Sequence, residues 1–168
     1  PMSDQPTHLI SESINKTKFI GETSVDSHMQ ESISKLTLEP MVAPSQAVLQ
    51  SIQQADTLFL GPGSFFTSTL PSLLMPELVT SLNNNPKLKI FLLMNVKKEF
   101  NSQCDDIDFQ LKFIKNLGIK KDINIVVPSH RKSDILACPF SCIHADIPAD
   151  IFGRHESEAL KLFVSDII

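Results

Sequence analysis

The chain has 168 residues, 42% of them hydrophobic, which is enough for one domain with a substantial core. Its nineteen acidic and fifteen basic side chains give a formal net charge of −4, and no basic face is visible, so we expect no nucleic-acid partner. The three cysteines are too few for a disulfide scaffold, and no apolar stretch approaches the ~20 residues of a membrane span. We therefore expect a cytoplasmic protein without a membrane span.

The amino-terminal part has the pattern of short β-strands. The ranges 7–11 and 18–20 are β-prone and are separated by a turn-like segment, so they predict a hairpin. The range 32–38 alternates imperfectly and predicts a third strand, which ends before Pro40. Because the chain starts at Pro1 and a strand follows almost at once, we expect a fragment of a longer protein.

From Pro44 onward, segments with a helical period alternate with segments that are apolar throughout. Continuous apolar runs are typical of strands that are covered on both faces, as in parallel sheets. The expected helices are 44–55, 75–85, 105–117 and a last one from about 155. The expected strands are 57–60, 88–95, 123–127 and 141–147. This alternation predicts a single α/β domain over residues 1–168, with a mainly parallel sheet, helices on both faces and a small β-hairpin near the start.

The stretch ADTLFLGPGSFFTST places a Gly-Pro-Gly turn directly after an expected strand. In parallel α/β sheets, ligands bind at the carboxyl ends of the strands. Gly61 and Gly63 allow positive φ and a close approach of a ligand, and Ser64 stands where the N-cap of the next helix is expected. The amide groups and the dipole of that helix would bind an anion, most simply a phosphate.

Other side chains of the stretch suit the same ligand. Thr67 and Ser68 would add hydroxyl donors, and Phe65 or Phe66 a flat surface for a ring. The alternative is a tight strand-to-helix turn without any ligand, because a short glycine loop is a weak motif without its context.

The context of the loop resembles a known family. The run ADTLFLGPGSFFTSTLPSLLMPELV is similar to the signature of the YvcK/CofD-like proteins, Ala-Asp-x-x-x-x-Gly-Pro-Gly-Ser-[Leu/Phe]-[Tyr/Phe]-Thr-Ser-x-x-Pro-x-Leu-Leu-x-Pro. Further segments that resemble the family are FIGETSVD, LTLEP, FLLMNV and DIPADIFGRHESEALKLFV. The likeness covers about residues 7–97 and 146–165.

The resemblance implies a Rossmann-like fold and the carboxyl-terminal half of a longer chain, because the family's Gly-Gly-Gly-Thr-Gly turn and Asp-Asp-Gly-Gly loop are not present. One branch of the family transfers a phospholactyl group to a deazaflavin and releases a guanine nucleotide. The other branch, the gluconeogenesis factor, binds uridine-diphosphate sugars. Glu22, Asp26 and the pair Arg154 and His155 make this sequence more similar to the gluconeogenesis-factor branch.

The resemblance also implies a set of ligand-binding residues: Gly61, Gly63, Ser64, Phe66, Thr67, Ser68, Asn95 and Arg154. In this set Asn95 would contact the sugar or base, and Arg154 would pair with a diphosphate in fork geometry. Phe66 stands in place of the family's commoner tyrosine and leaves only ring stacking. Around NVKKEFN the family's usual Met-Thr-Gln-x-Gly-Glu-Thr run is absent, and no residue is assigned a catalytic role.

Two other groups of residues have alternative interpretations. Cys138, Cys142 and His144 could be metal ligands, but a structural zinc site usually has closer cysteines and a fourth ligand, so a buried strand cysteine is favoured. The carboxylates of the range 105–108 could bind magnesium, but acidic residues at a helix start ordinarily cap it. We expect no metal site in this chain.

These features predict a regulatory protein of the gluconeogenesis-factor type, which binds a nucleotide or uridine-diphosphate sugar and links carbon metabolism to cell-wall synthesis and cell shape. A second interpretation is an enzyme similar to 2-phospho-L-lactate transferase with a guanine-nucleotide-activated donor. Only the transferase would need magnesium, and no other cofactor is expected. A third interpretation is a structural remnant that mediates oligomer contacts, and a homo-oligomer is compatible with all three.

Overall fold

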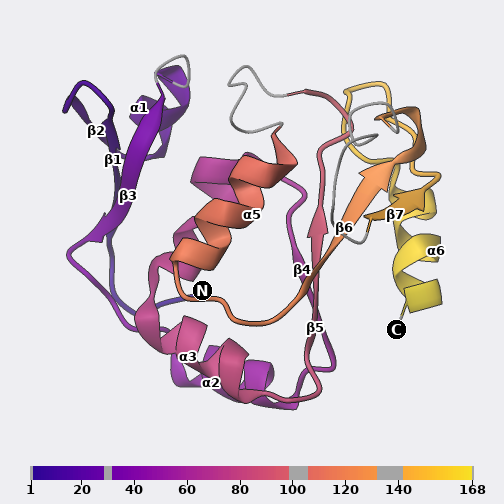
Figure 1. The fold of residues 1–168 in the computed structure, drawn as a ribbon, viewed down its shortest axis with the longest axis horizontal. Coiled ribbons are helices and arrows are strands. Elements are labelled where there is room, and N and C mark those ends of the chain that lie inside the picture. The colour runs from indigo at the N-terminus through magenta and orange to yellow at the C-terminus, as the bar shows by residue number, and fades with distance from the viewer. Residues whose placement is uncertain (1, 29–31, 99–105, 132–141, 168) are drawn as a thin grey trace.

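The computed structural model describes residues 2–28, 32–98, 106–131 and 142–167 (Figure 1). A three-stranded antiparallel sheet has the order β2-β1-β3 and consists of β1 (His8–Ser13), β2 (Lys18–Ile20) and β3 (Ile33–Glu39). A four-stranded parallel sheet has the order β4-β5-β6-β7 and consists of β4 (Thr57–Leu60), β5 (Lys89–Leu93), β6 (Ile123–Pro128) and β7 (Cys142–Ala145). The hairpin and the parallel sheet predicted from the sequence are both confirmed.

Five α-helices lie in the described ranges: α1 (Glu22–Ser27), α2 (Gln46–Gln54), α3 (Pro76–Asn84), α5 (Ile107–Asn116) and α6 (Ser157–Ile167). Between β4 and α3 the chain forms η1 (Phe65–Thr69), a turn of π-helix, and η2 (Pro71–Leu74), a turn of 3₁₀-helix. Helices α2, α3 and α5 lie on one side of the parallel sheet and α6 lies on the other (Figure 1). The expectation of helices on both faces is therefore confirmed.

Alternate side chains of β5 show how the two faces are filled. Ile90 and Leu92 belong to the larger apolar cluster, which also contains residues of α3 and α5. Phe91 and Leu93 belong to a smaller cluster on the face that α6 covers. Since successive side chains of a strand point to opposite faces, a continuous apolar strand is what a sheet covered on both sides requires.

Strand β4 and helix α1 differ from the sequence-based expectation. In the described sheet β4 is an edge strand, and its residues Thr57, Leu58 and Phe59 are only half-buried, although the sequence predicts burial on both faces. Helix α1 was not predicted, because it is only six residues long and its N-cap residue, Gly21, offers no capping side chain.

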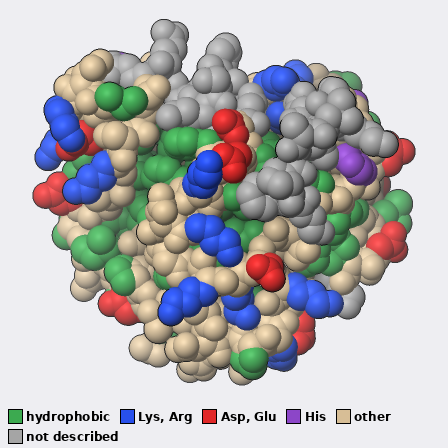
Figure 2. Space-filling view, in the orientation of Figure 1, with side chains coloured by type: hydrophobic (Ala, Val, Ile, Leu, Met, Phe, Trp, Pro, Cys, Tyr) green, Lys and Arg blue, Asp and Glu red, His purple; other side chains and the backbone are tan. Residues whose placement is uncertain are grey.

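The parallel arrangement brings the carboxyl ends of three strands to one edge of the sheet. Leu60 lies opposite Leu92, and Leu93 lies opposite Val126, so the segments that follow β4, β5 and β6 leave the sheet side by side. Both acidic and basic side chains are present on the face of the molecule shown in Figure 2. Within the described ranges, no helix has the length and the apolar character needed to cross a membrane.

Candidate functional site

The Gly-Pro-Gly-Ser segment follows β4 at this edge of the sheet. At Gly61 φ is +80°, and a Cβ there would lie 3.0 Å from the carbonyl oxygen of Leu93. At Gly63 a Cβ would lie 2.9 Å from Cβ of Ser68. Both positions therefore require glycine, because the loop packs closely against neighbouring residues of the same chain. This is the role that the glycines have if the segment is a tight turn without a ligand.

Asn95, two residues after the end of β5, holds this segment in place. The amide of Gly63 donates to Oδ1 of Asn95 at 3.1 Å, and Nδ2 of Asn95 donates to the carbonyl of Gly63 at 3.0 Å. The amide of Gly63 is thus occupied by the protein and is not vacant for an anion. Asn95 also lines the cavity described below. The family resemblance implies that its side chain contacts the sugar or base of a ligand. In the structure both polar groups of this side chain instead bond the backbone of Gly63.

Ser64 lies at the N-cap position predicted for it, although the helix that follows is only the five-residue turn η1. Its carbonyl accepts from the amides of Ser68 and Thr69 at 2.9 and 3.0 Å, whereas its hydroxyl makes no capping bond. So short a helix contributes little dipole, contrary to the expectation of a full helix terminus. The hydroxyl oxygen of Ser64 is buried and has no hydrogen-bond partner among the described residues. A buried polar atom without a partner costs free energy unless a ligand or water satisfies it.

The structure corrects the role expected for Phe66. This side chain is fully buried and packs edge-to-face against Phe65, Phe109 and Phe113, with ring centroids 5.3 to 6.1 Å apart. It therefore offers no free ring face to a ligand. Thr67 is buried as well, and its hydroxyl donates to Oδ1 of Asp26 at 2.9 Å.

A cavity of about 670 Å³ opens beside Ser64 at the carboxyl edge of the sheet. Among the described residues, three cationic side chains line it, those of Lys97, Lys98 and Arg154, against one carboxylate, that of Asp26. Other lining residues are Pro62, Gly63, Ser64, Asn95, Val96, Gly153, His155 and Leu160. The lining thus combines a net positive charge with the unsatisfied hydroxyl, an arrangement that favours a negatively charged ligand.

Arg154 reaches this cavity from a turn that its neighbours hold in shape. Its Nε donates to Oδ2 of Asp150 at 3.1 Å, and its guanidinium carbon lies 4.9 Å from the ring centroid of Phe152. Hydrogen bonds from the backbone amides of Arg154 and Phe152 hold the pKa of Asp150 below its usual range. Asp150 accepts a hydrogen bond from only one guanidinium nitrogen of Arg154, Nε, so the two terminal nitrogens, which have no hydrogen-bond partner among the described residues, can form a fork with a diphosphate.

The segment after β5 is held by three side chains that bond successive carbonyl groups. His155 donates from Nε2 to the carbonyl of Met94 at 3.1 Å. Arg131 and His130 donate to the two following carbonyls, those of residues 95 and 96, at 2.7 and 2.8 Å. Burial, and to a smaller extent the charge of His130, lower the pKa of His155. The lowered pKa favours the uncharged form of His155, which lines the cavity and bonds the backbone at the end of β5.

The model of the family described as 2-phospho-L-lactate transferase CofD matches residues 1–133. This chain belongs to the CofD family. A gluconeogenesis factor of Vibrio cholerae is 38% identical over 168 residues, which cover 99% of this chain and 56% of that protein. A second one, from Pasteurella multocida, is 26% identical over 173 residues and is matched over 55% of its length. The chain thus spans little more than half of the length of these relatives.

Two solved structures share the fold of this chain. Two crystal structures of the protein BH3568 from Bacillus halodurans, one described as a member of the UPF0052 family, each superimpose with a TM-score of 0.78 at 20% identity. They cover 100% of this chain and 61% of the other. This likeness shows that the α/β arrangement described above is shared by BH3568.

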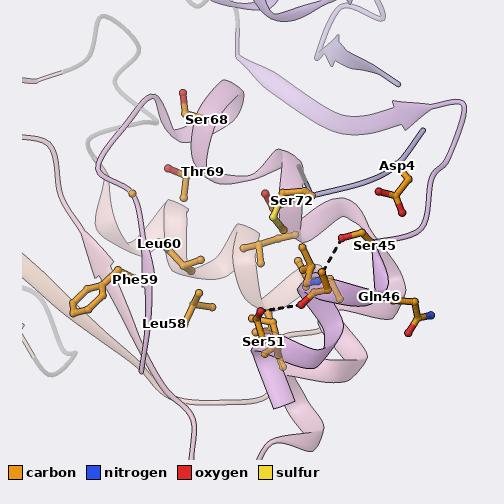
Figure 3. A pocket seen from close by; sticks show the side chains of 18 residues that line it. Asp4, Ser45, Gln46, Ser51, Leu58, Phe59, Leu60, Ser68, Thr69 and Ser72 are labelled. Carbon is orange, nitrogen blue, oxygen red and sulfur yellow. Dashed lines mark hydrogen bonds between the residues drawn. The ribbon is translucent and has the colours of Figure 1, made fainter. Parts of the chain in front are cut away.

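A second cavity of this CofD-family chain shares only Gly61 with the described Gly-Pro-Gly-Ser segment (Figure 3). It measures about 700 Å³, and side chains of α2, β4, η2 and α3 line it. Apolar residues such as Ile52, Leu58 and Leu73 form most of its wall, and Asp4 is the one charged residue among the described residues that line it. Such a wall suits the burial of apolar surface rather than the binding of an anion, so we place the candidate site in the first cavity.

The two cavities divide the residue set that the family resemblance implies. Gly63, Ser64, Asn95 and Arg154 line the charged cavity. Gly61 and Ser68 line the apolar one, as Figure 3 shows for Ser68. Phe66 and Thr67 line neither of them.

Sequence reasoning missed Lys97, Lys98 and Gly153 as members of the site. The two lysines directly follow the strand-ending Asn95, and this position was a usable signal, because side chains after parallel strands gather at one edge. Gly153 gives no comparable signal. Its importance follows from its φ of +76° and from the side chain of Lys97, which lies where a Cβ would be.

The described residues contain no group of three or more side chains that could hold a metal ion. Cys142 is half-buried in β7 and His144 is exposed there, whereas Cys138 lies outside the described residues. Asp106 accepts from the amide of Phe109 at 3.1 Å and so caps α5, and Asp108 pairs with Lys112 one helical turn later. The capping interpretation is confirmed for Asp106, Asp108 is an acidic residue of the first turn of α5, and Asp105 lies outside the described residues.

Proposed function

We propose that this chain forms one wall of a binding site for a nucleotide or a uridine-diphosphate sugar, in a cytoplasmic regulatory protein of the gluconeogenesis-factor type. In this role the protein senses the nucleotide sugar and links carbon metabolism to cell-wall synthesis and cell shape. The names of the Vibrio cholerae and Pasteurella multocida relatives support the assignment to this type.

One observation carries the proposal. Ser64, whose buried hydroxyl has no hydrogen-bond partner among the described residues, lines the same cavity as Lys97, Lys98 and Arg154. A diphosphate would satisfy the hydroxyl and accept charge-assisted hydrogen bonds from the terminal nitrogens of Arg154. The cavity volume of about 670 Å³ lies within the range of small-molecule sites.

Isothermal titration calorimetry of the purified protein tests this proposal with uridine-diphosphate glucose and uridine-diphosphate N-acetylglucosamine. We expect at least one of these ligands to bind without turnover. The Ser64→Ala and Arg154→Ala variants should bind it at least about tenfold more weakly, because each variant loses a hydrogen bond to the charged diphosphate. Lys161→Ala is the control, since it removes an exposed cation of α6 that is paired with Glu158. Full affinity of the Ser64→Ala, Arg154→Ala double variant would remove the site assignment.

A second candidate function is the transfer reaction after which the family model is named. In such a reaction a hydroxyl oxygen of the deazaflavin forms a new bond to phosphorus, and the bond from that phosphorus to the guanine nucleotide breaks. The described residues do not fit a magnesium site of their own, because Asp26 is the one carboxylate of the cavity and already accepts from Thr67. Release of guanosine monophosphate in the presence of a deazaflavin would favour this candidate over the sensing role.

A further inference from the structure

A tight turn beside the charged cavity exposes two large apolar side chains. The turn connects residues 149 and 155, which form an isolated antiparallel bridge. At its tip, Ile151 is 93% exposed and Phe152 is 71% exposed. Single exposed apolar side chains are common on protein surfaces and need no explanation. Phe152 differs because the residues that follow it, Gly153 and Arg154, line a cavity, so its ring is near a bound ligand.

The carboxylate of Asp150 braces this turn. Its Oδ1 accepts from the amides of Phe152 and Arg154, both at 2.8 Å, and its Oδ2 accepts from Nε of Arg154 at 3.1 Å. The backbone adds two bonds, from the amide of Asp150 to the carbonyl of Arg154 at 2.7 Å and from the amide of Gly153 to the carbonyl of Asp150 at 2.9 Å. The backbone that carries Phe152 is therefore fixed before any ligand arrives, which lowers the entropy cost of binding.

The ring of Phe152 contacts Arg154, which is one of the cationic residues that line the cavity. Gly153 and Arg154, the next two residues after Phe152, line the cavity. The guanidinium carbon of Arg154 lies 4.9 Å from the ring centroid of Phe152, within the range of a cation–π contact. When a phosphate of a ligand is bound by Arg154, the ring of Phe152 therefore lies close to that phosphate.

We infer that Phe152 is the platform on which the base of a nucleoside diphosphate stacks, while Arg154 and Lys97 hold its phosphates. The inference rests on the proposed function, which it deepens by naming the subsite of the base. Bases stack on aromatic side chains through their ring faces, and a neighbouring arginine strengthens such a surface. Phe66, which the sequence suggested for this role, is fully buried.

The experiment compares a ligand that has a base with one that has none. Affinities for uridine diphosphate and for inorganic pyrophosphate are measured by calorimetry for the protein and its variants. We expect Phe152→Ala to weaken uridine diphosphate binding about tenfold, as for the loss of one base stack, and to leave pyrophosphate binding unchanged. Phe152→Trp should keep the affinity for uridine diphosphate, whereas Arg154→Ala should weaken both ligands.

Ile151→Ala is the matched control, because it truncates an even more exposed apolar side chain of the same turn. We expect it to bind both ligands as the unaltered protein does. Since the ring of Phe152 is mostly exposed, Phe152→Ala should also keep the fold, and circular dichroism during thermal unfolding checks this point.

The possible failures are distinguishable. If the protein binds both ligands and Phe152→Ala binds uridine diphosphate with full affinity, the inference is overturned and the proposed function stands. If Phe152→Ala weakens both ligands equally, the ring only positions Arg154, and the stacking role is overturned. If the unaltered protein binds neither ligand, the proposed function itself fails, and the stacking role with it.

Discussion

The side chain of Asn95 forms two hydrogen bonds with the backbone of Gly63, one with its amide and one with its carbonyl. This pair ties the end of β5 to the loop after β4, so the place of Ser64 depends on it. For Asn95→Ala we expect a loss of about 1–3 kcal/mol in the free energy of unfolding, at roughly 0.5–1.5 kcal/mol per bond. We also expect weaker binding of uridine-diphosphate sugars. Urea denaturation and calorimetry measure the two effects.

Asn83 supplies a matched control for this prediction. Its amide makes the same kind of pair away from the cavity, donating to the carbonyl of Gly118 at 2.8 Å and accepting from the amide of Lys120 at 2.9 Å. Asn83→Ala should therefore lower stability similarly and keep the ligand affinity. An equal loss of affinity in the two variants would show that Asn95 acts only through general stability.

Gly153→Ala tests whether Lys97 belongs to the site. An added Cβ would lie 2.2 Å from both Cε and Nζ of Lys97, so this flexible side chain has to leave its place in the cavity. The φ of +76° adds about 1–2 kcal/mol of strain for a residue with a Cβ. We expect lower stability and weaker pyrophosphate binding, measured by urea denaturation and calorimetry.

Gly21→Ala separates the two effects of that substitution. Gly21 has a similar φ of +85°, but a Cβ there would meet no atom of the described residues within 4 Å. This variant should lose about the same stability and bind pyrophosphate with full affinity. Unchanged affinity in Gly153→Ala would argue against a role for Lys97.

The elements that the sequence predicts well are those with a strong local pattern. The apolar run of β5 and the amphipathic pattern of α5 each specify their own secondary structure, and both are found where expected. The edge position of β4 was not predictable in this way, because it depends on which other strands pair with it. Helix α1 is too short for its period to be recognised.

The candidate site was predictable to the extent that the glycine loop marks the carboxyl end of a strand. Ser64 and Arg154 do line one cavity, although they are far apart in the sequence. The orientation of neighbouring side chains in the loop was not predictable, because η1 is a π-helical turn and its residues do not follow the α-helical period. For this reason the sequence did not predict that Phe66 is fully buried.

Phe66→Ala should act on stability and not on ligand binding. The ring is 0% exposed and contacts three other phenylalanine rings, so its removal leaves a cavity in the core. We expect a loss of about 3–5 kcal/mol in the free energy of unfolding, measured by urea denaturation. In conditions where the variant is still folded, its affinity for uridine diphosphate should equal that of the unaltered protein. Weaker binding with unchanged stability would restore the stacking role to Phe66.

His155 should make stability depend on pH in the mildly acidic range. Burial lowers its pKa in the folded protein below 6.5, so the unfolded chain binds this proton more readily. Stability is therefore complete above about pH 6.5 and falls as the pH drops toward the folded pKa, by at most about 1.4 kcal/mol per pH unit. His155→Gln, which keeps a donor for the carbonyl of Met94, should lose less stability between pH 7.5 and 5.5. Urea denaturation at both pH values measures the difference, with His130 retained in both proteins. Parallel pH profiles would assign the dependence to other groups.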